Sequence, residues 1–314
     1  MESDNNTSHH LYLQNGSKQP ASGARVLVVG EILWDQFANE LRLGGAPLNF
    51  AVHLSRLRHL PLLLSGVGVD ARGIEARRAI QELGLDARLV QSTGVNTGIA
   101  LVHGETAGHE SFTIERPAAY DAIELSAALI GGLVTWNPAW LYYGTLFSAC
   151  SRPRAVLREL LESLPDASRF YDVNVRPGFD RPDLVADLLQ SADVVKLNEE
   201  ELQFVHDFLG LRSEPEDFCR VGCDRYGWRA VCVTLGDRGC AMRVAGDYVE
   251  AEGYRVDVAD TVGAGDAFAA AFLHSLIAEW PVAKIAEFAI RVGAFVASVH
   301  GAIPDQIPDA VFDT

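Results

Sequence analysis

Positively charged side chains are scarce in this sequence. Its 314 residues include 26 lysines and arginines against 42 aspartates and glutamates, so the formal net charge is −16 and the pI is near 4.9. A chain this acidic is unsuited to non-specific binding of nucleic acid or of an anionic membrane surface. We therefore expect neither as a partner. A nucleotide is still compatible with this charge, because a local cradle can bind phosphate inside an acidic protein.

Long apolar runs and paired cysteines are missing as well. No stretch approaches the roughly 18 consecutive apolar residues expected of a membrane-spanning helix. The five cysteines are odd in number, and only Cys219 and Cys223 lie close together, without a second pair to complete a zinc site. Ordinary reduced thiols are therefore expected. With the acidic charge and the lack of a targeting signal, they favour the cytoplasm.

The N-terminal segment lacks both the basic start and the apolar core of a signal peptide. Residues 1–24 are polar and rich in Asn, Ser, His and Gln, which predicts a disordered tail. Order is expected to begin at Arg25. The remainder shows neither an internal repeat nor a linker, so we expect residues 25–314 to form a single domain with a large core.

Apolar runs of strand length alternate with helical patterns over most of this domain. The run 26–29 is typical of a buried parallel strand, and residues 285–299 carry an apolar stripe at helical period. Strands are expected at 26–29, 62–64, 140–144, 169–174, 194–197 and 231–235, and helices at about 47–57, 72–83, 154–163, 182–190, 264–279 and 282–299. This alternation predicts an α/β fold wound in layers around a mainly parallel sheet.

The segment from about 87 to 116 departs from the alternation. Residues 98–102 and 111–114 look like two strands around the turn residues 104–109, and they have no helix of their own. We expect this hairpin and a segment near 36–44 to form a small β-lid on the main domain. Such a lid would close over a substrate and exclude water.

A turn of small residues stands directly before a long apolar helical run near the C-terminus. The turn is 260–266, with the sequence DTVGAGD, and it contains Gly263, Ala264, Gly265 and Asp266. Helix starts leave backbone N–H groups unpaired and carry partial positive charge, so this turn can hold an anion beside the Asp266 carboxylate. That pairing suits phosphoryl transfer, because the carboxylate can take a hydroxyl proton. Taken alone, the same residues also fit a capped helix behind a tight glycine connection.

Other polar clusters end strands or open helices. They are Asp35, Asn49, Asn174 with Arg176, Asn198 with Glu201, Thr234 with Gly236, and Asp266. The carboxyl ends of parallel strands share one edge of a sheet, so these residues are expected to converge on one cleft.

Four motifs in order resemble the ribokinase (PfkB) family of sugar kinases, and among these the fructokinases most. They are GGAPLNFA at 44–51, NEEE at 198–201, TLGDRG at 234–239 and DTVGAGD at 260–266. GEILWD at 30–35 and DVNVRP at 172–177 are typical of fructokinase-like members. The match covers about residues 25 to 308. It implies a ribokinase-like three-layer sandwich with a mainly parallel central sheet and a small β-lid.

The resemblance implies roles at the phosphoryl-transfer centre and the sugar site. Asp266 would be the base that accepts a proton from a sugar hydroxyl. Gly263, Ala264 and Gly265 would form the anion hole for the γ-phosphoryl group of ATP. The sugar would be bound by Asp35, Gly44, Gly45, Asn49 and Asp266. Arg176 would contact the substrate or a phosphate, or pair with an acid at the edge of the cleft.

The resemblance also implies nucleotide and cation sites. The nucleotide would be lined by Asn198, Thr234, Gly236, Gly239, Gly263 and Gly265. Asn198 and Glu201 would hold Mg²⁺ and phosphates through water, because Mg²⁺ keeps much of its hydration shell. Asp260 and the carbonyl of Val262, with residues 298–302 opposite, match a loop that holds K⁺ in this family.

The implied reaction is transfer of the γ-phosphate of ATP to a primary hydroxyl of a sugar. The substrate that the resemblance favours is fructose, and the product would be fructose 6-phosphate. The alternatives in the family are 2-keto-3-deoxygluconate, ribose or a nucleoside. A sugar acid calls for a cation facing its carboxylate, for which Arg116 and Arg176 are candidates. A catalytically silent binding module would be indicated by loss of Asp266 or the glycines, which are present. Many family members dimerise through the lid, so a homodimer is one implied arrangement.

Overall fold

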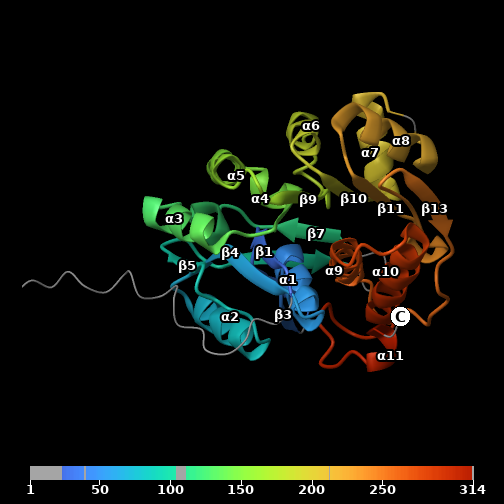
Figure 1. Cartoon of the computed structure of the whole chain (residues 1–314). Coiled ribbons are helices and arrows are strands. Elements are labelled where there is room, and N and C mark those ends of the chain that lie inside the picture. The colour runs from blue at the N-terminus through green and yellow to red at the C-terminus, as the bar shows by residue number, and fades with distance from the viewer. Residues whose placement is uncertain (1–22, 39, 104–110, 212, 313–314) are drawn as a thin grey trace, which may run out of the picture.

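Two sheets organise the molecule (Figure 1). The computed structural model describes residues 23–38, 40–103, 111–211 and 213–312. The central sheet has nine strands in the order β13-β12-β11-β10-β9-β8-β1-β4-β5. Its parallel strands are β1 (Arg25–Val29), β4 (Leu60–Gly68), β5 (Val90–Thr93), β8 (Trp140–Gly144), β9 (Ser168–Asp172), β10 (Val194–Asn198) and β11 (Ala230–Thr234). The antiparallel edge strands are β12 (Cys240–Val244) and β13 (Asp247–Ala251).

Helices cover both faces of the central sheet, so the predicted layered α/β fold is confirmed. One face packs against α1 (Ala46–Arg56), α2 (Ala71–Glu82), α9 (Ala264–Ile277) and α10 (Val282–Ala297). The other packs against α3 (Ala127–Trp136), α5 (Ser151–Ser163), α6 (Pro182–Gln190), α7 (Glu199–Leu209) and α8 (Pro215–Tyr226). Strand β1 supplies both cores, since Val26 and Val28 face one layer and Leu27 and Val29 the other. A strand buried on both faces accounts for the continuous apolar run in its sequence.

The second sheet has four strands in the order β3-β2-β6-β7. They are β2 (Leu33–Gln36), β3 (Leu41–Gly44), β6 (Gly98–His103) and β7 (Ser111–Ile114). The expected strands at 98–102 and 111–114 form the antiparallel pair β6–β7, while the turn residues 104–109 lie outside the described residues. Asp35 lies inside β2, whereas it was expected just beyond the end of a central strand. That this sheet closes over a substrate stays a prediction.

Several elements go beyond the sequence prediction. Strand β5 was expected within the lid, but it pairs with β4 in the central sheet. Helices α3 and α8 and the β12–β13 hairpin were not predicted, nor were the short helices α4 (Thr145–Ser148) and α11 (Asp309–Phe312). No helix in the described part of the chain is both long enough and apolar enough to span a membrane.

Candidate functional site

The N-terminal and C-terminal motifs meet through a buried hydrogen bond. Asn49 lies in the first turn of α1 and Asp266 in the first turn of α9. The Asn49 Nδ2 donates to Asp266 Oδ2 over 2.8 Å, although the two residues are 217 positions apart in sequence. Both side chains are buried, at 3% and 9% exposure. The amide therefore fixes one carboxylate oxygen of Asp266 and leaves the other for a different partner.

The environment of Asp266 suits a general base. Burial raises the pKa of its carboxyl to about 6, against the counteracting effects of the Asn49 amide, Lys196 and Arg176. The neighbouring Asp172 carboxylate adds to the increase in this pKa. A group with a pKa near 6 is ionised at neutral pH and is still basic enough to accept a hydroxyl proton.

The turn before α9 leaves the helix start open to an anion. Gly263 is in the left-handed region at φ 80°, and a Cβ there would come within 2.5 Å of the Ala302 Cα. Glycine is therefore required at this position by both backbone and space. No side chain caps the N-terminus of α9, and the Ala264 N–H donates to the Thr261 carbonyl at 3.3 Å. The N–H groups that follow it in the first turn face the position where a ligand anion would bind. At Gly265 a Cβ would lie 3.4 Å from Lys196 Nζ, which places an ammonium group beside the same turn.

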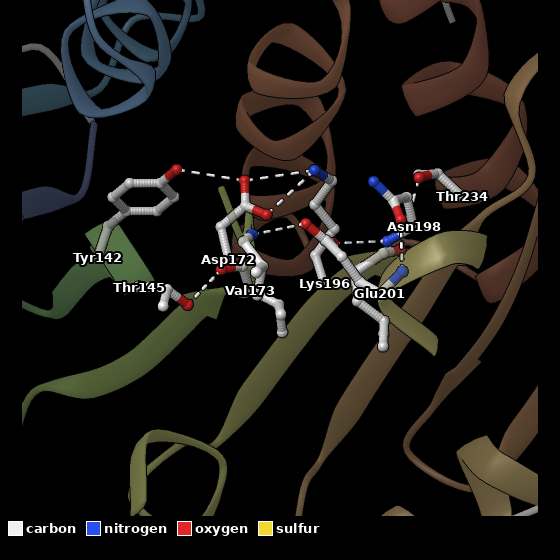
Figure 2. A network of polar contacts seen from close by, with 10 residues as sticks. Tyr142, Thr145, Asp172, Val173, Lys196, Asn198, Glu201 and Thr234 are labelled. Atoms are coloured by element: carbon white, nitrogen blue, oxygen red, sulfur yellow. Dashed lines mark hydrogen bonds and ion pairs between the residues drawn. The ribbon is translucent and has the colours of Figure 1, made fainter. Parts of the chain in front are cut away.

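Lys196 belongs to a buried network at the ends of β8, β9 and β10 (Figure 2). Its Nζ donates to Asp172 Oδ1 and Oδ2 at 3.1 and 3.3 Å, and the Tyr142 hydroxyl donates to Asp172 Oδ2 at 3.2 Å. Burial disfavours the charged ammonium, but the carboxylates of Asp172, Glu201 and Asp266 outweigh it and raise the pKa of Lys196. The site thus contains a fixed positive charge that sequence analysis did not find.

Asn198 and Glu201, the first and last residues of the NEEE motif, hydrogen-bond to the backbone beside this network. The Asn198 Oδ1 accepts from the Glu201 N–H at 2.8 Å, and Glu201 Oε2 accepts from the Asn198 N–H at 2.9 Å, which is a capping box at the start of α7. Glu201 Oε1 also accepts from the Val175 N–H at 2.8 Å. Glu201 therefore ties the loop after β9 to the end of β10, as Figure 2 shows.

This arrangement fits a hydrated magnesium ion better than direct coordination. Backbone N–H groups already occupy two of the roughly four acceptor positions on the Glu201 carboxylate. In the described part of the chain, no three His, Cys, Asp or Glu side chains are grouped so that they could hold a metal ion. An ion here would keep most of its shell of water and phosphate oxygens, as Mg²⁺ commonly does.

The TLGxxG residues form the turn after β11. The Thr234 hydroxyl donates to the Leu197 carbonyl at 3.4 Å. Gly236 has φ 64° with open space around its Cβ position. Gly239 has φ 104°, and a Cβ there would meet the Ala251 carbonyl at 2.0 Å. Glycine is thus required at position 239 because the turn packs against β13. At Gly236 no atom of the described residues lies near the position of a Cβ, so there is open space beside the turn.

The expected sugar residues surround the diglycine before α1. A Cβ on Gly44 would approach Asp35 Oδ2 to 2.3 Å, and one on Gly45, at φ 112°, would approach the Glu31 carbonyl to 2.5 Å. The two glycines therefore let the start of α1 lie directly against Glu31 and Asp35. One pocket here is lined by Glu31, Ala46, Pro47, Tyr142, Gly144, Thr145, Leu146, Asn174 and Arg176.

Two acids near the diglycine, Glu31 in this pocket and Asp35 beside Gly44, have raised pKa values. Burial raises the pKa of Glu31 and that of Asp35 each to about 7, with Asp266 adding to both increases and Arg176 opposing them. Carboxyl groups that are partly protonated near neutral pH can both donate to and accept from hydroxyl groups. Glu31 was not among the predicted site residues, although it stands in the same GEILWD motif as Asp35.

Arg116, one of the two cations considered for a sugar acid, is engaged elsewhere. Its guanidinium forms a buried ion pair with Asp121, in which Nε donates to Asp121 Oδ2 at 3.1 Å and Nη2 to Asp121 Oδ1. Its Nη1 donates to the Leu146 carbonyl at 2.6 Å. These contacts satisfy most of its donors, so Arg116 is poorly placed to receive a substrate carboxylate.

Asp260 lies beneath the turn before α9. Its Oδ1 accepts from the Val262 N–H at 3.0 Å, and its Oδ2 accepts from the Gly301 N–H and from Arg42 Nη1, each at 3.0 Å. The turn, the segment after α10 and the second sheet are therefore joined at this one carboxylate.

Known proteins that resemble this chain are carbohydrate kinases. A model of the "pfkB family carbohydrate kinase" matches residues 25–310. The chain is 29% identical over 301 residues to a fructokinase of Escherichia coli, covering 89% of this chain and 95% of that protein. It is 27% identical over 276 residues to fructokinase-1 of Oryza sativa subsp. japonica, covering 83% and 84%.

Solved structures with the same fold include enzymes for two different sugars. A fructokinase with bound ATP from Xylella fastidiosa aligns with a TM-score of 0.76 at 23% identity, covering 88% of this chain and 93% of that one. A 2-dehydro-3-deoxygluconokinase from Thermotoga maritima aligns with a TM-score of 0.79 at 17% identity, covering 90% and 96%. The ribokinase-like fold implied by the sequence motifs is confirmed, and the chain belongs to the PfkB family of carbohydrate kinases.

Proposed function

We propose that this protein transfers the γ-phosphate of ATP to the primary hydroxyl of a neutral sugar, with fructose as the preferred acceptor. The observation that carries the proposal is the buried Asn49–Asp266 contact at the uncapped start of α9. This contact holds a carboxylate of raised pKa in the first turn of a helix whose N-terminus has no side-chain cap. A base and an anion site side by side are what phosphoryl transfer to a hydroxyl requires.

In the proposed reaction, Asp266 orients the sugar hydroxyl and takes its proton. The hydroxyl oxygen forms a bond to the γ-phosphorus, and the bond from that phosphorus to the β–γ bridging oxygen breaks in line, so that ADP leaves. The N–H groups of residues 263–265 and the Lys196 ammonium would stabilise the negative charge on the transferred group. Mg²⁺ bound with the nucleotide would neutralise phosphate charge, held through water by Asn198 and Glu201.

The pocket chemistry supports a neutral sugar over a sugar acid. Glu31 lines the pocket and Asp35 lies against Gly44 of the adjoining diglycine. A substrate carboxylate bound there would meet like charge whenever either acid is ionised. Arg116 is committed to Asp121, which removes one of the two cations that a sugar acid would use. The relatives named fructokinase in Escherichia coli and rice point in the same direction.

The test is a coupled assay with ATP and a panel of fructose, 2-keto-3-deoxygluconate, ribose and adenosine. We expect kcat/KM to be highest for fructose, by at least about tenfold, which corresponds to roughly 1.4 kcal/mol of transition-state binding. A higher value for 2-keto-3-deoxygluconate would overturn the proposed substrate and leave the kinase chemistry standing. Measurable ATP binding without turnover of any acceptor would favour a binding module instead.

A further inference from the structure

An arginine from the second sheet occupies the carboxylate at which the sequence resemblance implies a potassium site. Arg42, on β3, reaches Asp260 with its Nη1 3.0 Å from Oδ2. Asp260 is buried, with 9% of its side chain exposed, and Arg42 has 30% exposed. Because one partner of this pair is buried, solvent and salt screen it less than a pair between two exposed side chains.

Further contacts fix the Arg42 guanidinium in this position. Its Nη2 donates to Glu40 Oε2 at 2.6 Å, and its Cζ lies 4.6 Å from the centre of the Phe37 ring. Strand register places Arg42 directly opposite Asp35 on β2. The guanidinium is therefore held by the second sheet itself and does not reach Asp260 as a free surface side chain.

Several oxygens of this loop already accept hydrogen bonds. Asp260 accepts N–H donors on both oxygens. The Ala302 carbonyl accepts from His53 Nε2 at 2.9 Å, and burial lowers the pKa of His53 to about 4, so this imidazole is neutral. Just before the expected segment 298–302, the Ala297 carbonyl accepts from the N–H groups of Ala259 and Asp260 at 2.9 and 3.3 Å. Two N–H groups and the Arg42 guanidinium already occupy three of the roughly four acceptor positions on the Asp260 carboxylate. A potassium ion at the remaining position would be repelled by the guanidinium, so Asp260 does not fit the ion.

We propose that Arg42 takes the place of the monovalent cation in this kinase. Its guanidinium neutralises Asp260 beneath the turn before α9, so the turn keeps its shape and its positive character without a bound potassium ion. An uncompensated Asp260 would instead repel the phosphoryl group as negative charge develops on it. Arg42 acts through Asp260 and is thus a positioning residue. The activity part of this inference rests on the proposed sugar-kinase function.

The first test compares turnover in potassium chloride with turnover in tetramethylammonium chloride at equal ionic strength. For the unchanged protein we expect the two rates to agree within about twofold, because no charge remains for the ion to compensate. Arg42→Met should lower kcat by roughly 10–100-fold in the potassium-free buffer, and potassium should restore at least about fivefold of that loss. Arg42→Lys keeps the charge and should need no potassium.

A matched control is Arg78→Met on α2, an arginine that also bridges acidic partners but lies far more exposed. It should neither lose activity nor respond to potassium. The second readout needs no sugar: potassium should raise the thermal unfolding midpoint of Arg42→Met and leave that of the unchanged protein in place. If Arg42→Met folds poorly, the rate and the unfolding midpoint of Arg42→Lys and of the unchanged protein still test the inference, because neither should respond to potassium.

Strong potassium stimulation of the unchanged protein, or an Arg42→Met variant that potassium affects in neither readout, would overturn the inference. If the unchanged protein phosphorylates no sugar, the proposed function fails by itself. The thermal measurements then still decide whether Arg42 stands in for the cation.

Discussion

At the scale of single residues, the proposed base Asp266 should determine how the rate depends on pH. Its folded pKa is about 6, and only the ionised carboxylate can accept the hydroxyl proton. We expect kcat/KM to be level above about pH 7 and to fall tenfold per unit below pH 6, as the carboxylate becomes protonated. Initial rates across this range measure the acid limb, and an inflection near the ordinary aspartate value of 3.8 would argue against a buried base.

The same raised pKa has a consequence for stability. The folded protein holds the Asp266 proton more tightly than the unfolded chain does, so stability falls as pH rises from about 4 to 6 and stays lower above that window. Asparagine cannot ionise and would remove this cost. We expect Asp266→Asn to raise the free energy of unfolding at pH 7.5 by on the order of 1–3 kcal/mol in urea titrations. A destabilised variant would mean that the carboxylate is better compensated than its surroundings suggest.

Only some site residues can be recognised one at a time from sequence. Asp266 and Asn49 can be recognised because they lie in motifs that combine glycines with a helix start. Lys196 and Tyr142 lie within strands whose other residues are mostly apolar. The sequence does not show that the lysine is buried and charged until its partner is known. Here that partner is Asp172, 24 positions away. Sequence periodicity does not show which residues lie opposite each other on neighbouring strands. The network around Asp172 and Lys196 could therefore not be predicted.

At the scale of elements, the ends of β9 and β10 carry a charge pair whose structural and catalytic roles can be separated. Lys196→Met or Asp172→Asn alone leaves one buried charge unpaired and should cost roughly 3–5 kcal/mol of stability. The double variant removes both charges, so its thermal midpoint should recover most of that loss. Its kcat should nevertheless stay roughly 10²–10³-fold low if the ammonium stabilises the transferred phosphoryl group. Recovery of both stability and kcat in the double variant would reduce the pair to a structural role.

Elements with strong periodicity were predictable, and those shaped by local turns were not. The apolar runs at 26–29 and 140–144 correspond closely to β1 and β8 because both faces of these strands are buried. The β12–β13 hairpin turns through Ala245 at φ 50° and Gly246 at φ 98°. A left-handed alanine is not a turn signal that sequence reasoning looks for, so this hairpin was missed.

At the scale of the whole molecule, function depends on contacts between parts that are distant in sequence. Asn49 and Asp266 join the starts of two helices. Arg42 and Asp260, 218 positions apart, join the second sheet to the turn before α9. The motifs predicted the family, and the alternation of strand and helix patterns predicted the layered fold. The motifs did not predict the Arg42–Asp260 contact. The relative placement of the two sheets follows from side-chain packing, which a short sequence motif does not specify.

The most direct test of the central claim is the steady-state rate of Asp266→Asn with fructose and ATP, measured beside calorimetric binding of ATP. We expect ATP affinity to stay within a few fold and kcat to fall by roughly 10²–10⁴-fold, the usual contribution of a general base. The acid limb of the pH profile should disappear with the carboxylate. Near-normal turnover by Asp266→Asn, with its ATP binding intact, would contradict the assignment of Asp266 as the base.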